Sequence, residues 1–184
     1  DTILVHAAAG GVGLILCQWA SALGATVIGT VSTDEKAELA RAHGCHHPIV
    51  YTRQDFVAEV NQITDGAKLP VVYDSVGRHT FLKSLDCLRP RGLMVSFGNA
   101  SGPPDPIAPG LLAQKGSLFL TRPTLFSYIA TREELEQSAA ELFDMVRSGK
   151  VKVEIGQRFA LKDAAEAHRQ LEARTTTGST VLTV

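Results

Sequence analysis

Short apolar runs alternate with amphipathic stretches over the first two-thirds of the chain. The apolar runs have the length of strands and are expected at Thr2–His6, Thr26–Val31, His47–Tyr51, Leu69–Asp74, Gly92–Phe97 and Ser117–Thr121. Segments with helical spacing lie between the earlier runs, at residues 11–23, 34–43, 54–64 and 78–88. This order predicts an α/β fold, a doubly wound parallel sheet with right-handed crossovers and helices on both faces. Near-continuous apolar strand centres such as Ile3–Val5 agree with burial on both faces.

The pattern changes after about residue 130. The elements expected there are a helix, a strand, a helix and a strand, at Thr131–Ser148, Val151–Ile155, Asp163–Ala173 and Ser179–Val184. Asp163, with Glu166 three residues later, is typical of a capping box that opens the second helix. We therefore expect residues 1–130 to form the doubly wound domain and residues 131–184 to belong to a neighbouring layer or domain.

Composition and charge exclude several functions. The 184 residues are 45% hydrophobic and 20% charged, which are values of a globular protein. The formal net charge is −1, so no overall field attracts nucleic acid or an anionic membrane. The uncharged stretch from Thr2 to Thr33 is broken by glycines at element boundaries, which favours a buried strand, turn, helix and strand over a membrane span.

Cysteine usage and the start of the chain suggest its setting. The three cysteines, at positions 17, 45 and 87, form no CxxC pair and no even set, so we expect a reducing, cytoplasmic location. The chain opens at Asp1 without methionine and runs directly into a strand pattern. We therefore expect a piece of a longer protein.

The strongest chemical signal is a glycine-rich turn at Val5–Gly13, between the first strand and the first helix. Aligned with the G-x-G-x-x-G pattern, its key positions are Ala8, Gly10 and Gly13, so alanine replaces the first glycine. Gly10 would let the backbone approach a pyrophosphate, and Gly13 would let the helix lie close to the strand. Free N–H groups at the start of the helix would then bind the anion. The turn therefore predicts a Rossmann-type dinucleotide site.

The end of the second strand indicates which dinucleotide binds. A carboxylate that binds the adenosine ribose usually lies about 20 residues after the glycine turn. Here Ile28–Thr33 holds no carboxylate, so no Asp or Glu is available in this segment to bind a ribose 2′-hydroxyl. Ser32, Thr33 and Lys36 could instead bind a 2′-phosphate with hydroxyls and a cation, while the neighbouring acidic residues suit the first turn of a helix. The pattern favours NADPH over NADH.

Two later strand ends also carry glycine, in Val72–Gly77 and Val95–Gly102. In an open parallel sheet the ligand lies beyond the carboxyl ends of the strands, at the point where the strand order reverses. Glycines there let the backbone approach a ligand closely. We therefore expect both segments along the path of the nicotinamide ribose.

Several segments occur in order over nearly the whole chain: AAAGGVG, GTVSTDEKA, VVYDSVG, LMVSFGN and KGSLFLTRPTL. Together they resemble the NADPH-dependent quinone oxidoreductases, the zeta-crystallin-like branch of the zinc-free medium-chain dehydrogenase/reductase superfamily. The resemblance implies an N-terminal GroES-like catalytic domain outside this sequence, onto which residues 131–184 return. Because hydride transfer needs both walls of the cleft, this chain alone is expected to bind coenzyme with little turnover.

The resemblance also implies which residues bind the coenzyme. Those expected at the pyrophosphate are Gly10, Gly11, Val12 and Gly13. Those expected around the 2′-phosphate are Ser32, Lys36, Tyr51 and Arg174. Those expected on the adenosine-side wall are Ser75 and Val76. Those expected near the nicotinamide are Phe97, Gly98 and Asn99.

The implied activity is reduction of a quinone by NADPH. A quinone is already electrophilic and its reduced oxygens can take protons from solvent, so no catalytic acid or base is assigned. His43–His47 lacks a second ligand pair at zinc spacing, and no metal site is expected. The resemblance further implies a homodimer through the edge strand at residues 117–121. Two alternatives stay open: an NADPH-dependent enoyl reductase of the same superfamily, and a non-enzymatic nucleotide-binding or structural role.

Overall fold

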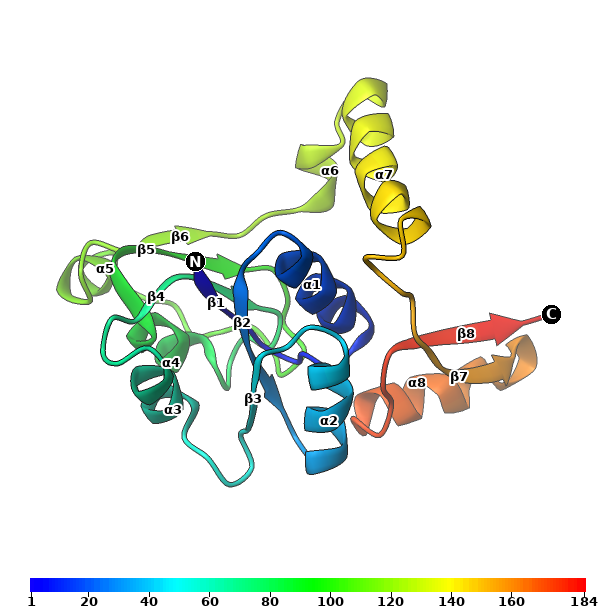
Figure 1. Ribbon diagram of the computed structural model, residues 1–184, viewed down its shortest axis with the longest axis horizontal. Helices are drawn as coiled ribbons and strands as arrows, with labels where there is room; N and C mark the ends of the chain where they lie inside the picture. The colour runs from blue at the N-terminus through cyan, green and yellow to red at the C-terminus, as the bar shows by residue number, and fades with distance from the viewer.

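A six-stranded parallel sheet forms the centre of the computed structural model, which describes residues 1–184 (Figure 1). Its strands are β1 (Thr2–Val5), β2 (Thr26–Val31), β3 (His47–Val50), β4 (Leu69–Asp74), β5 (Leu88–Ser96) and β6 (Phe119–Thr121). Their spatial order is β3-β2-β1-β4-β5-β6, and each neighbouring pair is parallel. The predicted doubly wound sheet is confirmed, and the strand order reverses between β1 and β4.

Successive residues of each strand bury their side chains on opposite faces of this sheet. The helices that cover the two faces are α1 (Gly11–Ala22), α2 (Asp34–Ala42), α3 (Phe56–Ile63), α4 (Phe81–Asp86) and α5 (Gly110–Gln114). Ile3 and Val5 pack in one apolar cluster with α1 and α2, whereas Leu4 belongs to a second cluster with α3 and α4. This explains the near-continuous apolar strands. No helix of the chain has both the length and the apolar character needed to cross a bilayer.

The last third of the chain forms a separate layer beside the sheet (Figure 1). It consists of α6 (Leu125–Tyr128), α7 (Arg132–Arg147), β7 (Ile155–Ala160), a short 3₁₀ turn (Leu161–Asp163), α8 (Ala164–Glu172) and β8 (Ser179–Thr183). β7 and β8 pair in parallel with each other. The Gln18 side chain exchanges two hydrogen bonds with the Lys152 backbone, and the Gly178 amide donates to the Ala9 carbonyl at 3.1 Å. These bonds hold the segment against the glycine turn.

Two predictions for this segment are wrong. The strand expected at Val151–Ile155 begins only at Ile155, because the backbone groups of Lys152 bond to Gln18 and the Val151 amide bonds to the Met145 carbonyl. The capping box expected at Asp163 and Glu166 does not form; the Glu166 carboxylate accepts hydrogen bonds from Arg169 and Gln170 instead. A capping box does open α7, where Thr131 and Glu134 bond reciprocally.

Candidate functional site

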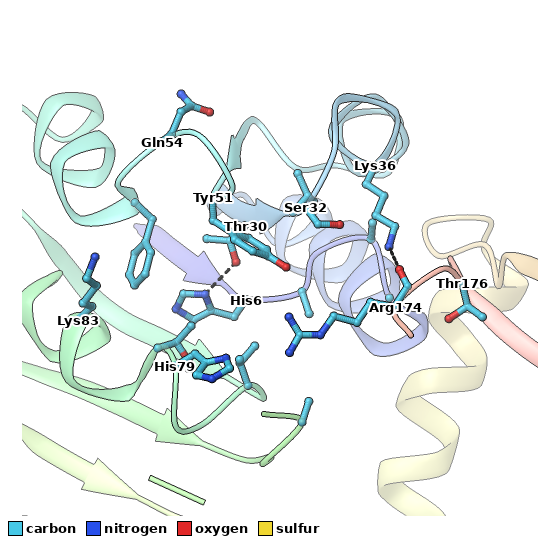
Figure 2. Close-up of a pocket in the computed structure, with 18 of the residues that line it drawn as sticks. His6, Thr30, Ser32, Lys36, Tyr51, Gln54, His79, Lys83, Arg174 and Thr176 are labelled. Atoms are coloured by element: carbon cyan, nitrogen blue, oxygen red, sulfur yellow. Dashed lines mark hydrogen bonds between the residues drawn. The ribbon is translucent and has the colours of Figure 1, made fainter. Parts of the chain in front are cut away.

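A cavity of about 380 Å³ lies at the carboxyl ends of the strands, across the point where the strand order reverses (Figure 2). Its wall comes from the ends of β1 and β2, the loops after β3, β4 and β5, the first turns of α2, α3 and α4, and the end of α8 with the residues that follow it. Such a crevice at a topological switch point is where open α/β sheets bind their ligands.

The glycine turn presents unpaired amides at this cavity. Gly10 lines it and is the N-cap of α1, with φ −79° and ψ 171°. The Gly11 amide faces the Gly178 carbonyl, because Gly10 and Gly178 form an isolated parallel β-bridge. The amides of Val12 and Gly13 have no acceptor within the protein, and the first turn of α1 holds no acidic residue. The unpaired N–H groups of Val12 and Gly13 and the positive end of the helix dipole therefore suit an anion here.

A second anion-binding corner lies at the end of β2. The Lys36 ammonium donates a hydrogen bond to the Arg174 carbonyl oxygen at 2.6 Å, and both side chains line the cavity together with Ser32 and Tyr51 (Figure 2). Burial, and then the positive charge of Arg174, lower the pKa of Lys36. An anion bound between these two cations would stabilise the charged form of Lys36.

The carboxylates near this corner are engaged elsewhere. Asp34 accepts two hydrogen bonds from Arg53, at 2.5 and 2.8 Å, and these bonds lower the pKa of Asp34. Asp55, which does line the cavity, pairs with Lys83 at 3.1 Å. Lys36 and Arg174 therefore face the cavity without a carboxylate partner.

Arg174 holds an uncommon backbone conformation. It follows the last turn of α8 with φ 59°, in the left-handed region that favours glycine at this position of a helix end. A non-glycine residue there carries a cost of about 1 kcal/mol. In this conformation the Arg174 carbonyl accepts the hydrogen bond from Lys36, 138 positions away, and the Arg174 side chain lines the cavity. The unfavourable backbone conformation therefore occurs at a residue that joins the tail to the cavity wall.

The structure brings only part of the predicted site to the cavity wall. The predicted residues that line it are Gly10, Ser32, Lys36, Tyr51, Val76 and Arg174. The others are not among the lining residues. They lie in the first turn of α1 and after the ends of β4 and β5: Gly11, Val12, Gly13, Ser75, Phe97, Gly98 and Asn99. The loops after β4 and β5 are tied together, because the Ala100 and Ser101 amides donate to the Ser75 and Val76 carbonyls at 3.1 and 2.8 Å.

Sequence reasoning missed other parts of the wall. The missed residues near the ends of the first four strands are His6, Thr30, Gln54, Asp55, Phe56, His79, Thr80 and Lys83. The rule that ligands lie beyond the carboxyl ends of strands would have found Gln54 and its neighbours had it been applied to the third strand. Leu171 and Thr176 also line the cavity, but they come from the distant tail and no local pattern marks them.

Strand order, glycine turn and cavity together define a dinucleotide-binding domain of the doubly wound type. The family model described as zinc-binding dehydrogenase matches residues 11–145, and the chain belongs to this family.

Individual relatives are similar along the whole chain. A quinone oxidoreductase of Pseudomonas aeruginosa is 59% identical over 99% of the chain, which covers 56% of that protein. A crystal structure of an Escherichia coli quinone oxidoreductase complexed with NADPH matches all of the chain with a TM-score of 0.96 and 53% identity, over 57% of its own length. A 2-haloacrylate reductase of a Burkholderia species is 52% identical over 99% of the chain, which covers 55% of that protein. The resemblance to quinone oxidoreductases is confirmed, and the chain spans little more than half of these relatives.

The residues of this chain do not form the zinc site that the family description names. No group of three or more His, Cys, Asp or Glu side chains lies close enough together to hold a metal ion. In the histidine-rich segment, His43 bonds to the Leu39 carbonyl and to Glu154, and His46 Nδ1 accepts the Val27 amide. These histidines connect helix, strand and tail.

Proposed function

We propose that this chain is the coenzyme-binding part of an oxidoreductase that transfers reducing equivalents from NADPH to quinones. The observation that carries the proposal is the pair of cations, Lys36 and Arg174, that faces the cavity at the end of β2 without a carboxylate partner. NADPH differs from NADH by a 2′-phosphate on the adenosine ribose, which such a pair binds well. The quinone substrate is supported by the names of relatives at 59% and 54% identity.

Each group of residues has a role in holding the coenzyme. The turn formed by Gly10, Gly11, Val12 and Gly13 binds the pyrophosphate with the free amides at the start of α1, and Ser32, Lys36, Tyr51 and Arg174 surround the 2′-phosphate. Ser75 and Val76 form the adenosine-side wall. Phe97, Gly98 and Asn99 line the coenzyme near its nicotinamide half. The bound coenzyme supplies the hydride, and the protein supplies orientation. No residue of this chain is assigned a proton transfer, because the reduced quinone oxygens can take protons from water.

The 2-haloacrylate reductase similarity supports a second candidate, an NADPH-dependent reductase of an activated carbon–carbon double bond. That relative is 52% identical, close to the values for the quinone oxidoreductases, so the coenzyme half of the site does not separate the two activities. The discriminating measurement is NADPH oxidation by the full-length protein with a quinone and with a 2-haloacrylate as alternative substrates.

The isolated chain is expected to bind NADPH and to reduce quinones very slowly. Positioning the substrate against the nicotinamide supplies a large share of the rate, and one wall of a cleft does not provide it. Titration of NADPH fluorescence measures binding, and NADPH oxidation in the presence of a quinone measures turnover. Absence of NADPH binding would overturn the proposed site. Rapid quinone reduction by the 184-residue chain would overturn its assignment as the coenzyme half alone.

We further propose that residues 1–130 are the coenzyme domain, that residues 131–184 return toward a catalytic domain, and that the protein acts in the cytoplasm. The tail carries apolar side chains that the chain leaves uncovered, including Phe143 at 61% and Val153 at 49% exposure. No residue of α7 is buried. A second domain packed there would cover this surface. The three cysteines are all free, as a reducing compartment would keep them.

A homodimer through β6 is the assembly we propose. β6 is the edge strand of the sheet, and its Phe119 and Leu120 are 61% and 38% exposed. An exposed apolar edge favours pairing with another strand. Sedimentation equilibrium at several concentrations is expected to show a dimer that Leu120→Lys converts to monomer. Leu182→Lys, at a leucine 39% exposed on β8, is the matched control and should leave the dimer intact. A wild-type monomer at every concentration would discard the assembly.

A further inference from the structure

A chain of buried polar side chains lies behind the cavity wall. His6, at the end of β1, places Nδ1 2.8 Å from the Thr30 hydroxyl and Nε2 2.9 Å from the Ser84 hydroxyl. Ser84 in turn bonds to a carboxylate oxygen of Asp74 at 3.0 Å. All four side chains are buried, with exposures of 2% or less. Figure 2 shows the imidazole of His6 turned toward Thr30, with the His6–Thr30 bond as a dashed line.

Asp74 organises the loop that follows β4. One of its carboxylate oxygens accepts the amides of Val76 and Gly77, at 2.8 and 3.0 Å. The other accepts the hydroxyls of Thr80 and Ser84, at 2.7 and 3.0 Å. Val76 and Thr80 line the cavity, so the same carboxylate that ends the buried chain also fixes part of the cavity wall.

The positions of the protons along this chain follow from donor capacity. An ionised carboxylate only accepts hydrogen bonds, so Ser84 must give its single hydroxyl hydrogen to Asp74. The Ser84 oxygen can then only accept from His6, which requires a hydrogen on Nε2. A neutral imidazole with that hydrogen has a bare Nδ1, which accepts the hydroxyl hydrogen of Thr30. With a neutral imidazole, only one arrangement of the hydrogens therefore satisfies all three bonds: Thr30 donates to His6, His6 donates to Ser84, and Ser84 donates to Asp74.

The surroundings keep this imidazole neutral. Burial lowers the pKa of His6 to about 4, against the opposing effect of the Asp74 charge. The Phe56 ring packs edge-on against the His6 ring, with centroids 5.0 Å apart. The Lys83 ammonium lies over the Phe56 ring and pairs with Asp55. Both ring nitrogens are occupied, so His6 offers no free polar atom to a ligand although it lines the cavity.

We propose that His6 is a positioning residue for coenzyme binding: as a neutral Nε2–H imidazole it ties the ends of β1 and β2 to α4 and Asp74, and so fixes the β4–α4 wall of the adenosine half of the cavity. The histidine in this site is therefore neither an acid nor a base in the reaction. The part of this inference that concerns the coenzyme rests on the proposed function, whereas the proton positions and the ordering of the loop do not.

The first test reads the tautomer directly in the coenzyme-free protein. Nitrogen-15 NMR of the histidine-labelled chain is expected to show His6 neutral, with its hydrogen on Nε2, at pH 8 and still at pH 5.5. A hydrogen on Nδ1, or a protonated ring at pH 5.5, would overturn the assignment. Neither result depends on whether NADPH binds.

The second test uses a matched pair of variants at Thr30. Thr30→Val keeps the shape of the side chain but removes the donor to His6 Nδ1, and Thr30→Ser keeps the hydroxyl. We expect Thr30→Val to release the His6 tautomer, to speed hydrogen exchange at the Val76 and Gly77 amides, and to weaken NADPH binding about tenfold. Thr30→Ser should restore all three to within about twofold. Unchanged exchange in Thr30→Val would sink the positioning role. Faster exchange with no NADPH binding even in the wild type would leave the ordering of the loop by His6 intact and reject the proposed function instead.

Discussion

Replacing Lys36 with glutamate is expected to weaken NADPH binding by about a hundredfold or more, while NADH binding changes by no more than about threefold. A hydrogen bond to a charged group contributes about 1.5 to 3 kcal/mol, and the substitution both removes one such bond and places a carboxylate beside the phosphate. Arg174 alone would then face two negative groups. NADH carries a 2′-hydroxyl in place of the phosphate, so the new carboxylate repels no phosphate there, and the hydrogen bond that this hydroxyl can donate to the carboxylate offsets the lost bond between Lys36 and the Arg174 carbonyl.

Fluorescence titration with both coenzymes measures this selectivity. Lys150→Glu is the matched control, because it makes the same change of charge at an exposed lysine outside the cavity wall. It should leave both dissociation constants unchanged. An equal loss of NADPH and NADH binding in Lys36→Glu would mean that the residue supports the tail and does not bind the phosphate.

The order of strands and helices could be predicted because strands buried on both faces of a sheet are apolar at nearly every position. Ile3, Leu4 and Val5 belong to two different apolar clusters, yet a strand with both sides covered needs all three to be apolar. The strand expected at Val151–Ile155 did not form as predicted, although its residues alternate between apolar and charged as in a half-buried strand. The side chain of Gln18, more than a hundred positions away, takes the backbone bonds of Lys152 that a strand partner would need.

The candidate site shows the same division between local and distant signals. Gly10 and Lys36 follow directly from their places after the first and second strands, and the structure puts both on the cavity wall. Arg174 came only from resemblance, since its contact with Lys36 spans 138 positions. The buried chain from Thr30 to Asp74 had no signal at all, because polar residues at strand ends also occur in ordinary turns.

Replacing Gly13 with alanine is expected to cost about 4 kcal/mol of stability, or to prevent folding altogether. A β-carbon there would lie 2.2 Å from the Ala7 carbonyl oxygen and 2.8 Å from two backbone atoms of Ala8. Those atoms are backbone at the end of β1, so relief requires α1 to move away from the turn. Urea unfolding of the coenzyme-free chain measures the loss without reference to binding.

Gly10→Ala separates this packing requirement from binding. A β-carbon at Gly10 would lie 3.3 Å from the Ala7 carbonyl oxygen, and the φ of −79° suits alanine, so the fold should lose about 1 kcal/mol at most. Its methyl group would enter the cavity where the backbone must approach the pyrophosphate, and NADPH binding should fall more than about tenfold.

Gly110→Ala is the control for both glycine variants, since nothing lies within 4 Å of a β-carbon at the first residue of α5. That substitution should be neutral or slightly stabilising, because alanine restricts the unfolded chain. If Gly13→Ala were as stable as Gly110→Ala, α1 would not lie against the turn as closely as the structure has it. If Gly10→Ala bound NADPH like the wild type, the anion would not approach the backbone at the start of α1. The two glycines, three positions apart, therefore test packing and binding independently.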